Sequence, residues 1–398
     1  MAEALEAGRR DGVALAISAV VLRGGVLVHQ GCHGELASPA AAVVPVGGTA
    51  PAARHPLTPA DLFDVASLTK VLCTTTLSAQ AVAEGALELD APLRRWLPGF
   101  AAAGKGEVTV RQLLAHSSGL PWWRPYHLAA QGEPDPSRRR ALVVEALMVE
   151  PLQAPPATRS VYSDPGFMAL GLALEAALGA RLPALFEARV AAPLGLTDTF
   201  FVDHLDPAGA SGRTAGRCFA PTRREGARGL RQGSVDDDNA WALGGAAGHA
   251  GLFSTALDVA AIGQAWIDGL AGRSSPVPAE AARRFAARDS APGSCRALGW
   301  DTRSPEGSTL GEWLGRGPVG ALGHLGFTGC SLWLDRDAEV VAALLTNHVH
   351  PTGSDRARIN GLRRRFHDAV ALGLGLAGPP GPSGTSGPPS RSSDRERA

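Results

Sequence analysis

The chain has 398 residues, of which 45% are hydrophobic and 19% charged, and this composition excludes a fibrous or wholly disordered protein. Its 38 basic residues balance its 38 acidic residues, so no net field favours nucleic acid or an anionic membrane as a partner. Five scattered cysteines without a C-x-x-C pair are too few for a disulfide framework. They favour a reducing compartment, and we therefore expect a cytoplasmic protein.

An apolar run over residues 13–22 follows Arg9 and Arg10 and superficially resembles a secretory signal. The run is far shorter than the roughly 20 residues of a membrane helix, and no small-residue cleavage pattern follows it. Residues 23–25 indicate a turn, after which residues 26–28 resume the apolar run. We predict a β-hairpin that enters the fold and no membrane span, with export as the alternative.

The pattern of apolar residues predicts strands at both ends of the chain and helices between them. Helices are expected over 64–84, 110–114, 137–149, 166–178, 183–192, from 255 onwards, and over 355–372. Strands are expected at 298–300, 331–334 and 340–345. Surface loops are expected over 36–57 and, rich in Gly, Arg and Asp, over 203–239.

This order of elements predicts an α+β fold, in which both chain ends complete one antiparallel sheet flanked by helices. The sheet domain is expected to comprise residues 1–90 and 240–375, and an inserted, mainly α-helical domain residues 91–239. Residues 379–398 are almost exclusively Gly, Pro, Ser and Arg. They are expected to form a disordered tail, because they cannot bury enough apolar surface to order themselves.

Lysine is scarce, since only Lys70 and Lys105 are lysines among the 38 basic residues. Ser67 precedes Lys70 by three positions, which at a helix start places the hydroxyl and the amine on one face, about one turn apart. Serine is a poor nucleophile until a base takes its proton, and lysine can be that base when its surroundings lower its pKa. Alone, a Ser-x-x-Lys pattern is a weak signal.

Two further motifs could contribute to a site. Tyr162-Ser163-Asp164 offers a phenol that can share a proton with a catalytic lysine, or else it only opens a helix with Asp164 as N-cap. The sequence from His324 to Gly329 precedes an apolar strand, and its glycines allow a ligand to approach the backbone closely. The alternative is a bulged edge strand that carries an incidental histidine.

Together, the three motifs resemble those of the serine β-lactamase and penicillin-binding-protein superfamily. Within it they are most similar to the branch of class C β-lactamases, D-alanyl-D-alanine carboxypeptidases and esterases. The resemblance covers roughly residues 10–372, and the flanking text matches at FDVASLTK (63–70), LLAHSSGL (113–120), GHAGLFST (248–255) and HLGFTG (324–329).

The resemblance implies a role for each motif. Ser67 would be the acylated nucleophile, Lys70 its base, and Tyr162 the proton relay for acylation and deacylation. The backbone N–H groups of Ser67 and Phe327 would form the oxyanion hole. No metal or organic cofactor is expected. The remaining lysine and tyrosine, Lys105 and Tyr126, are expected at the surface.

One departure from the family concerns the second motif, which usually ends in Asn. Asp164 cannot donate a hydrogen bond while it is ionised. Its charge favours a protonated Lys70, which shifts the role of general base from Lys70 towards Tyr162.

The other departure concerns the third motif, commonly Lys-Thr-Gly, whose cation and hydroxyl hold the substrate carboxylate. Here His324 is mostly neutral and Leu325 has no hydroxyl. Asp164, His324, Leu325 and Gly326 are thus expected to contact a small, less polar ester or amide. The alternatives are a D-alanyl-D-alanine carboxypeptidase or β-lactamase, and a non-catalytic scaffold, against which the intact Ser67, Lys70 and Tyr162 argue.

Other motifs receive a structural interpretation. Residues 373–378 match G-x-G-x-x-G but close a helix, so nucleotide binding is rejected. Residues 236–238, and His348 with His350, lack a full set of metal ligands and are expected to be solvated loop residues. His116 and His249 are expected to hydrogen-bond the loops that frame the cleft. The oligomeric state is not indicated.

Overall fold

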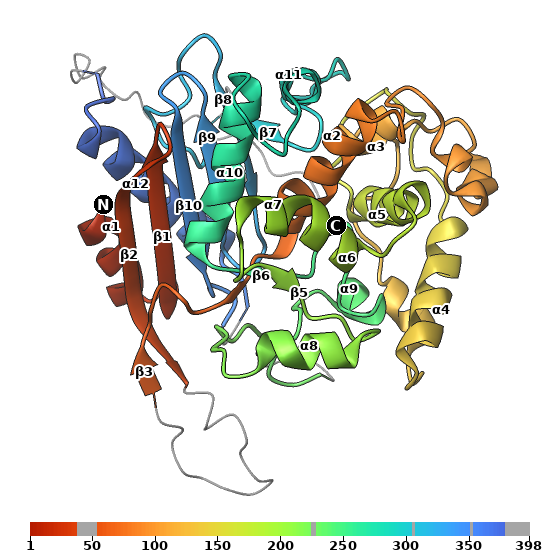
Figure 1. Cartoon of the computed structure of the whole chain (residues 1–398), viewed down its shortest axis with the longest axis horizontal. Helices are drawn as coiled ribbons and strands as arrows, with labels where there is room; N and C mark the ends of the chain where they lie inside the picture. The colour runs from red at the N-terminus through yellow and green to blue at the C-terminus, as the bar shows by residue number, and fades with distance from the viewer. Residues whose placement is uncertain (38–53, 224–227, 305–306, 351–352, 379–398) are drawn as a thin grey trace, which may run out of the picture.

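The computed structural model describes residues 1–37, 54–223, 228–304, 307–350 and 353–378. Its larger sheet has seven strands in the order β3-β2-β1-β10-β9-β8-β7, and all neighbours are antiparallel. The strands are β1 (Ala16–Arg23), β2 (Val26–Ala37), β3 (Arg54–Pro56), β7 (Asp301–Thr302), β8 (Ala321–Leu325), β9 (Ser331–Asp335) and β10 (Val340–Thr346). Figure 1 shows the red N-terminal strands beside the blue C-terminal ones, which confirms that both chain ends build one sheet.

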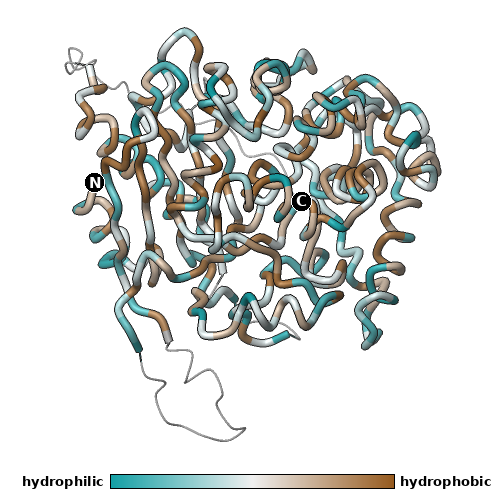
Figure 2. Tube along the Cα trace, viewed as in Figure 1, coloured by the Kyte–Doolittle hydropathy of each residue, from teal (hydrophilic) through white to brown (hydrophobic). Residues whose placement is uncertain are grey.

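The centre of this sheet is buried on both faces, because successive side chains of a strand point in opposite directions. On β1, Ala19 and Val21 belong to a core formed with α1 (Ala2–Arg10) and α12 (Arg356–Gly373). Val20 points the other way, into the larger core that contains α10 (Ala256–Leu270). The trace of β1 is correspondingly hydrophobic in Figure 2, whereas the outer strand β2 carries more hydrophilic residues.

The predicted hairpin at the N-terminus is confirmed. Gly24 and Gly25 have φ angles of 56° and 80°, the left-handed values that a tight two-residue turn requires. The expected loop over 36–57 is shorter than predicted, because β2 continues to Ala37 and β3 begins at Arg54. Residues 38–53 and the expected tail, 379–398, lie outside the described residues.

Helices cover the sheet and fill the middle of the chain. The remaining helices are α2 (Thr76–Ala83), α3 (Val110–Leu114), α4 (Pro136–Met148), α5 (Asp164–Leu178), α6 (Leu182–Phe186), α7 (Ala192–Leu194), α8 (Pro207–Thr214), α9 (Asp238–Ala242) and α11 (Ala279–Ala286). A small second sheet has the order β4 (Phe63–Asp64), β6 (Leu252–Ser254), β5 (Phe200–Phe201). The helices α3, α4 and α5 lie together, to the right of the sheet in Figure 1. The domain boundaries near 90 and 240 stay a prediction.

Three predicted elements are wrong in detail. The helix expected over 64–84 is interrupted: strand β4 comes first, then a 3-10 turn at Ala66–Leu68, then a wide helical segment, Lys70–Thr75, that continues into α2. The segment 203–239 contains α8 and the start of α9. Residues 298–300 form a bend instead of a strand, because Gly299 has a φ of 81° and donates its N–H to Leu114 O; the strand begins at Asp301.

Within the described ranges, no single helix is long and apolar enough to cross a membrane. Helix α5 and the helical segment Leu182–Leu194 reach that length and apolarity only as a pair, with a bend of 73° between them.

The expectation that Lys105 and Tyr126 are surface residues is wrong. Lys105 is fully buried, and its ammonium donates to the carbonyl oxygens of Ala102 (2.8 Å), Met148 (2.8 Å) and Glu150 (2.6 Å). Tyr126 is 5% exposed. An ammonium has three N–H donors, so Lys105 satisfies all three and links its own turn at Ala102 to the end of α4 at Met148 and Glu150.

Candidate active site

The turn that presents Ser67 is built by the residue at the end of β4. Ala66 has a φ of 49°, a left-handed value that is unfavourable for a residue with a Cβ atom. The carboxylate of Asp64 accepts the N–H of Ala66 at 2.8 Å and so holds this turn. Ser67 follows directly, is partly accessible, and begins the helical segment that carries Lys70.

Lys70 lies at the centre of the site and is fully buried. Its Nζ is 3.0 Å from Ser67 Oγ, 2.7 Å from Asp164 Oδ1 and 3.1 Å from the backbone oxygen of His249. All three donors of an ammonium therefore have partners. Three segments far apart in the sequence meet at this one nitrogen.

The charges around Lys70 keep its proton in place. Burial opposes the charge, but the carboxylate of Asp164 and the phenol of Tyr162 outweigh it and raise the pKa of Lys70. Burial of the Tyr162 hydroxyl raises the pKa of Tyr162 to about 12, although Lys70 opposes that rise. Near neutral pH the resting site thus holds a protonated Lys70 and a protonated Tyr162, as the charge of Asp164 led us to expect for the lysine.

Tyr162 is held between two histidines. Its ring centroid is 4.7 Å from that of His116 and 5.9 Å from that of His324, and the Nζ of Lys70 lies 4.9 Å from its centre. The hydroxyl of Tyr162 also interacts with Lys70 and Ser67. The structure therefore brings the three sequence-predicted catalytic side chains into one cluster.

The loop before α5 places Asp164 against Lys70. Ser163, and not Asp164 as one interpretation had it, is the N-cap: its Oγ accepts the N–H of Gly166 at 3.2 Å and donates to Pro121 O at 2.7 Å. The N–H of Ser163 donates to Nδ1 of His116 at 2.9 Å. Burial lowers the pKa of His116 well below its usual range, so the imidazole is neutral and can accept this bond. His116 thus has the structural role predicted for it.

His324 lies on β8, where burial lowers its pKa to about 4. The ring is therefore neutral at physiological pH, as predicted. Its Nδ1 lies 2.9 Å from the oxygen of Leu325, so Nδ1 carries the proton and Nε2 is a free acceptor with no partner among the described residues. The site has lost the cation that the family's third motif usually supplies.

The residues after His324 contact the turn that presents Ser67. A Cβ atom at Gly326 would lie 2.6 Å from the backbone oxygen of Val65, so only glycine fits there. The hydroxyl of Thr328 donates to the backbone oxygen of Asp64 at 2.8 Å. Phe327 is 51% exposed. The strand that carries the third motif is thereby fixed against the turn that carries Ser67.

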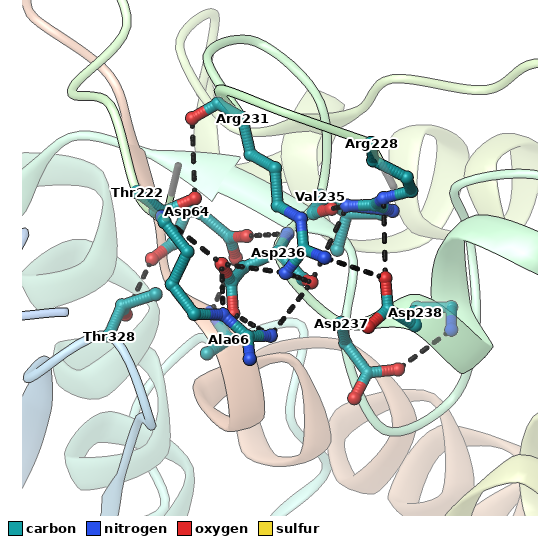
Figure 3. A network of polar contacts seen from close by, with 12 residues as sticks. Asp64, Ala66, Thr222, Arg228, Arg231, Val235, Asp236, Asp237, Asp238 and Thr328 are labelled. Atoms are coloured by element: carbon teal, nitrogen blue, oxygen red, sulfur yellow. Dashed lines mark hydrogen bonds and ion pairs between the residues drawn. The ribbon is translucent and has the colours of Figure 1, made fainter. Parts of the chain in front are cut away.

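Behind the turn that presents Ser67 lies a buried network of charges (Figure 3). The second oxygen of Asp64 accepts the N–H of Asp236 at 2.6 Å, and burial together with the charge of Asp236 raises the pKa of Asp64 to about 7. Arg231 donates to the backbone oxygen of Asp236 and to Asp238, each at 2.9 Å. Arg231 and Asp236 are buried, so the expectation of a solvated acidic loop at 236–238 is wrong.

Two other histidine predictions are now settled. Nε2 of His249 contacts Asp237 at 2.9 Å, and the backbone oxygen of His249 accepts a hydrogen bond from Lys70, in agreement with the predicted structural role. His348 is not solvated: its Nδ1 contacts Val13 O and its Nε2 accepts the N–H of Asp355. Burial of His348 could not be predicted from the sequence, because Val13 is 335 positions away in the chain.

Sequence reasoning also missed Arg296, whose guanidinium carbon lies 5.8 Å from the ring centre of Tyr162. Its Nε donates to Asp301 at 2.8 Å. Arg296 belongs to an irregular segment without a motif, so only the folded chain reveals its position. Trp122 is 60% exposed and its backbone oxygen accepts the N–H of Asp164, so an exposed aromatic residue adjoins the segment that carries Asp164.

Comparison with known proteins identifies the family to which this chain belongs. A family model described as Beta-lactamase matches residues 1–364. The "Putative D-alanyl-D-alanine carboxypeptidase" of Escherichia coli (strain K12) is 29% identical over 316 residues, 74% of this chain and 70% of that protein. The "N-acetylmuramyl-L-alanine amidase" of Bacillus subtilis (strain 168) is 30% identical over 311 residues, 73% of this chain and 68% of that protein.

Among solved structures, EstCE1, a hydrolase with promiscuous acyltransferase activity, is similar with a TM-score of 0.65 and 20% sequence identity. The similarity covers 92% of this chain and 97% of that one, and it supports the fold. Fold and family together define a serine hydrolase of the β-lactamase-like class. The chain belongs to the β-lactamase family.

Proposed function

We propose that the protein hydrolyses a small ester or amide through a covalent acyl-enzyme on Ser67. The observation that carries the proposal is the 3.0 Å contact between Lys70 Nζ and Ser67 Oγ, with Tyr162 beside both. A serine hydroxyl becomes an effective nucleophile when a base within hydrogen-bond distance takes its proton. Lys70 and Tyr162 are the two groups in position to do so.

The reactive form, in this proposal, has one proton fewer than the resting site. Asp164 keeps Lys70 charged, so the missing proton comes from the coupled pair of Lys70 and Tyr162. That pair takes the proton of Ser67 while its oxygen bonds to the acyl carbon. The same proton then passes to the leaving alcohol or amine. In the second half of the reaction, water attacks the acyl carbon and gives a proton to the pair, the bond between Ser67 Oγ and the acyl carbon breaks, and the pair returns the proton to Ser67. Activity is expected to rise with pH.

The developing negative charge on the acyl oxygen would be held by the backbone N–H groups of Ser67 and Phe327. Supporting this assignment, Gly326 allows the strand to approach Val65 closely, and the bond from Thr328 to Asp64 holds the two segments together.

A less polar substrate fits the surroundings of Ser67. His324 is neutral and Leu325 has no hydroxyl, so neither can bind a carboxylate as Lys-Thr-Gly does. Trp122 and Phe327 are aromatic and exposed beside the motifs, and they offer apolar surface to an acyl chain. We therefore place an ester or amide without a carboxylate ahead of penicillins and D-Ala-D-Ala termini.

One observation favours a second candidate, a carboxypeptidase. Arg296 places a guanidinium beside Tyr162, and guanidinium is well suited to bind a substrate carboxylate. The relative from Escherichia coli is named accordingly. The ion pair of Arg296 with Asp301 argues for the ester or amide, since a substrate carboxylate would have to compete with Asp301.

We propose a cytoplasmic location, as the scarce cysteines indicate. In support, the apolar run that resembles a secretory signal forms most of β1, whose residues 16–22 are buried between β2 and β10. Removal of such a strand would open the centre of the sheet.

The proposal is tested by incubating the protein separately with an activated acyl ester, a fluorophosphonate and a penicillin, and locating adducts by mass spectrometry. We expect labelling on Ser67, faster turnover of the ester than of the penicillin, and neither label nor turnover in Ser67→Ala. Full turnover by Ser67→Ala would refute the mechanism. Preference for a penicillin or a D-Ala-D-Ala peptide, abolished in Arg296→Gln, would favour the second candidate.

A further inference from the structure

Three side chains with metal-binding atoms meet beyond the active-site cluster. They are His55 on β3, Asp61 in the turn between β3 and β4, and Cys218 in the segment after α8. Nε2 of His55 lies 3.1 Å from Oδ1 of Asp61, and one ligand atom from each of the three residues lies within 4.8 Å of the others. β3 forms the lower edge of the sheet in Figure 1.

The backbone holds this group together. Leu62, next to Asp61, donates its N–H to the backbone oxygen of Cys218 at 2.9 Å, and Ala220 donates its N–H to the backbone oxygen of Leu62 at 2.7 Å. His55 is fixed by the pairing of β3 with β2, opposite Leu36. Because the bonds lie in the main chain, the side chains of Asp61 and Cys218 remain neighbours whatever their protonation.

The carboxylate of Asp61 is oriented as a metal ligand usually is. Its Oδ2 accepts the N–H of Thr58 at 2.6 Å and the hydroxyl of Thr58 at 3.0 Å, so that oxygen is occupied. Oδ1, which has no contact with Thr58, faces His55 at 3.1 Å, and Oδ2 lies slightly farther from His55, at 3.3 Å. Hydrogen bonds from neighbouring groups commonly orient metal-binding carboxylates in this way. Asp61 is only 4% exposed, while His55 and Cys218 are partly accessible, so an ion can enter from their side.

We propose that His55, Asp61 and Cys218 bind one divalent transition-metal ion, preferentially Zn²⁺, with water as the fourth ligand. Imidazole, carboxylate and thiolate are all ligands of tetrahedral zinc. Ligand atoms about 2.0 Å from a tetrahedral ion lie about 3.3 Å apart, close to the observed separation of His55 and Asp61. The thiol of Cys218 gives up its proton to solvent on binding, because thiolate is the ligand form.

Such an ion would link three segments, one of which leads directly to Ser67. Asp61 is directly followed by Leu62 and β4, and β4 ends at the residue that holds the turn before Ser67. The ion would stabilise this region without contacting the reacting atoms. The proposal is thus independent of the serine chemistry, which needs no metal.

Metal binding can be measured on the full chain after metal removal. We expect one equivalent of Zn²⁺ per chain by elemental mass spectrometry after Zn²⁺ addition and desalting. With Co²⁺ as a spectroscopic probe, we expect a thiolate-to-cobalt charge-transfer band that disappears in Cys218→Ser. The band should persist in Cys295→Ser, a matched loss of another partly exposed thiol. Zn²⁺ should raise the melting temperature of the unmodified protein and of Cys295→Ser, but not that of Cys218→Ser.

Fluorophosphonate labelling of each variant shows whether the active site is folded and separates this test from that of the hydrolase. A thiolate-to-cobalt band that survives in Cys218→Ser would overturn the proposal, as would Co²⁺ binding by His55→Ala that equals that of the unmodified protein. The proposal would also be overturned if the folded, reduced and metal-free protein, after addition of Zn²⁺ and desalting, retained no Zn²⁺ and showed no shift in melting temperature.

Discussion

Replacing Asp164 by Asn removes the carboxylate that keeps Lys70 charged. The contact of 2.7 Å is a charge-assisted hydrogen bond, and its partner is fully buried. Such bonds contribute about 1.5–3 kcal/mol, equivalent to about one to two pH units in the loss of a proton. Because a raised pKa must be exceeded before the proton leaves, Asp164→Asn moves the rise in activity to lower pH.

The assay is the pH profile of kcat/KM for a short-chain acyl ester. On its rising limb, activity at a fixed pH should increase about 10- to 100-fold in Asp164→Asn. Asp11→Asn removes an exposed carboxylate at the N-terminal end of the chain and should leave the profile unchanged. A limb that stays in place, or moves to higher pH, in Asp164→Asn would show that Asp164 does not control the proton of Lys70.

Other variants probe the supports of the site. The pKa of Asp64 is raised to about 7, so its protonated form stabilises the folded protein at acidic pH, and this contribution is lost as the pH rises towards 7. In urea unfolding between pH 5 and 8, the free energy of unfolding of Asp64→Asn should lose this dependence on pH. Lys105→Met leaves three carbonyl oxygens without their donor and should lower the free energy of unfolding by about 2–4 kcal/mol in urea titration; an unchanged value would contradict its structural role. Gly326→Ala forces a Cβ atom against Val65 and should lower kcat at least about 10-fold, whereas Gly212→Ala, which has open space around it, should not.

The sequence predicted best those features that depend on local spacing. Ser67 and Lys70 are three residues apart, and any helical turn brings such side chains to one face, even though the segment here starts as a 3-10 turn. The hairpin at Gly24 and Gly25 followed equally from local chemistry, because only glycine adopts both turn conformations easily. The closure of the sheet by the two chain ends followed from the order of predicted elements.

Features that depend on distant partners could not be predicted in this way. Lys105 and Asp236 are charged residues in segments that resemble loops, and charged residues are ordinarily exposed. Each is buried because its hydrogen-bond partner lies far away in the sequence: the ammonium of Lys105 donates to the backbone oxygen of Glu150, and the N–H of Asp236 donates to the carboxylate of Asp64. The same holds for Arg296, which reaches Tyr162 across 134 positions of the chain only in the folded protein.

Helix α12 supports the segment that follows His324, with a consequence for biosynthesis. Arg363 on α12 donates to the backbone oxygens of Gly326 (2.9 Å) and Cys330 (2.7 Å), and β10 pairs with β1 along its whole length. Ser67 is synthesised well before Gly326, Cys330 and Arg363, the residues that shape its surroundings. The proposed active site is therefore completed only after residue 363 has been synthesised, and β1 obtains its partner β10 more than 300 residues after β1 itself is made.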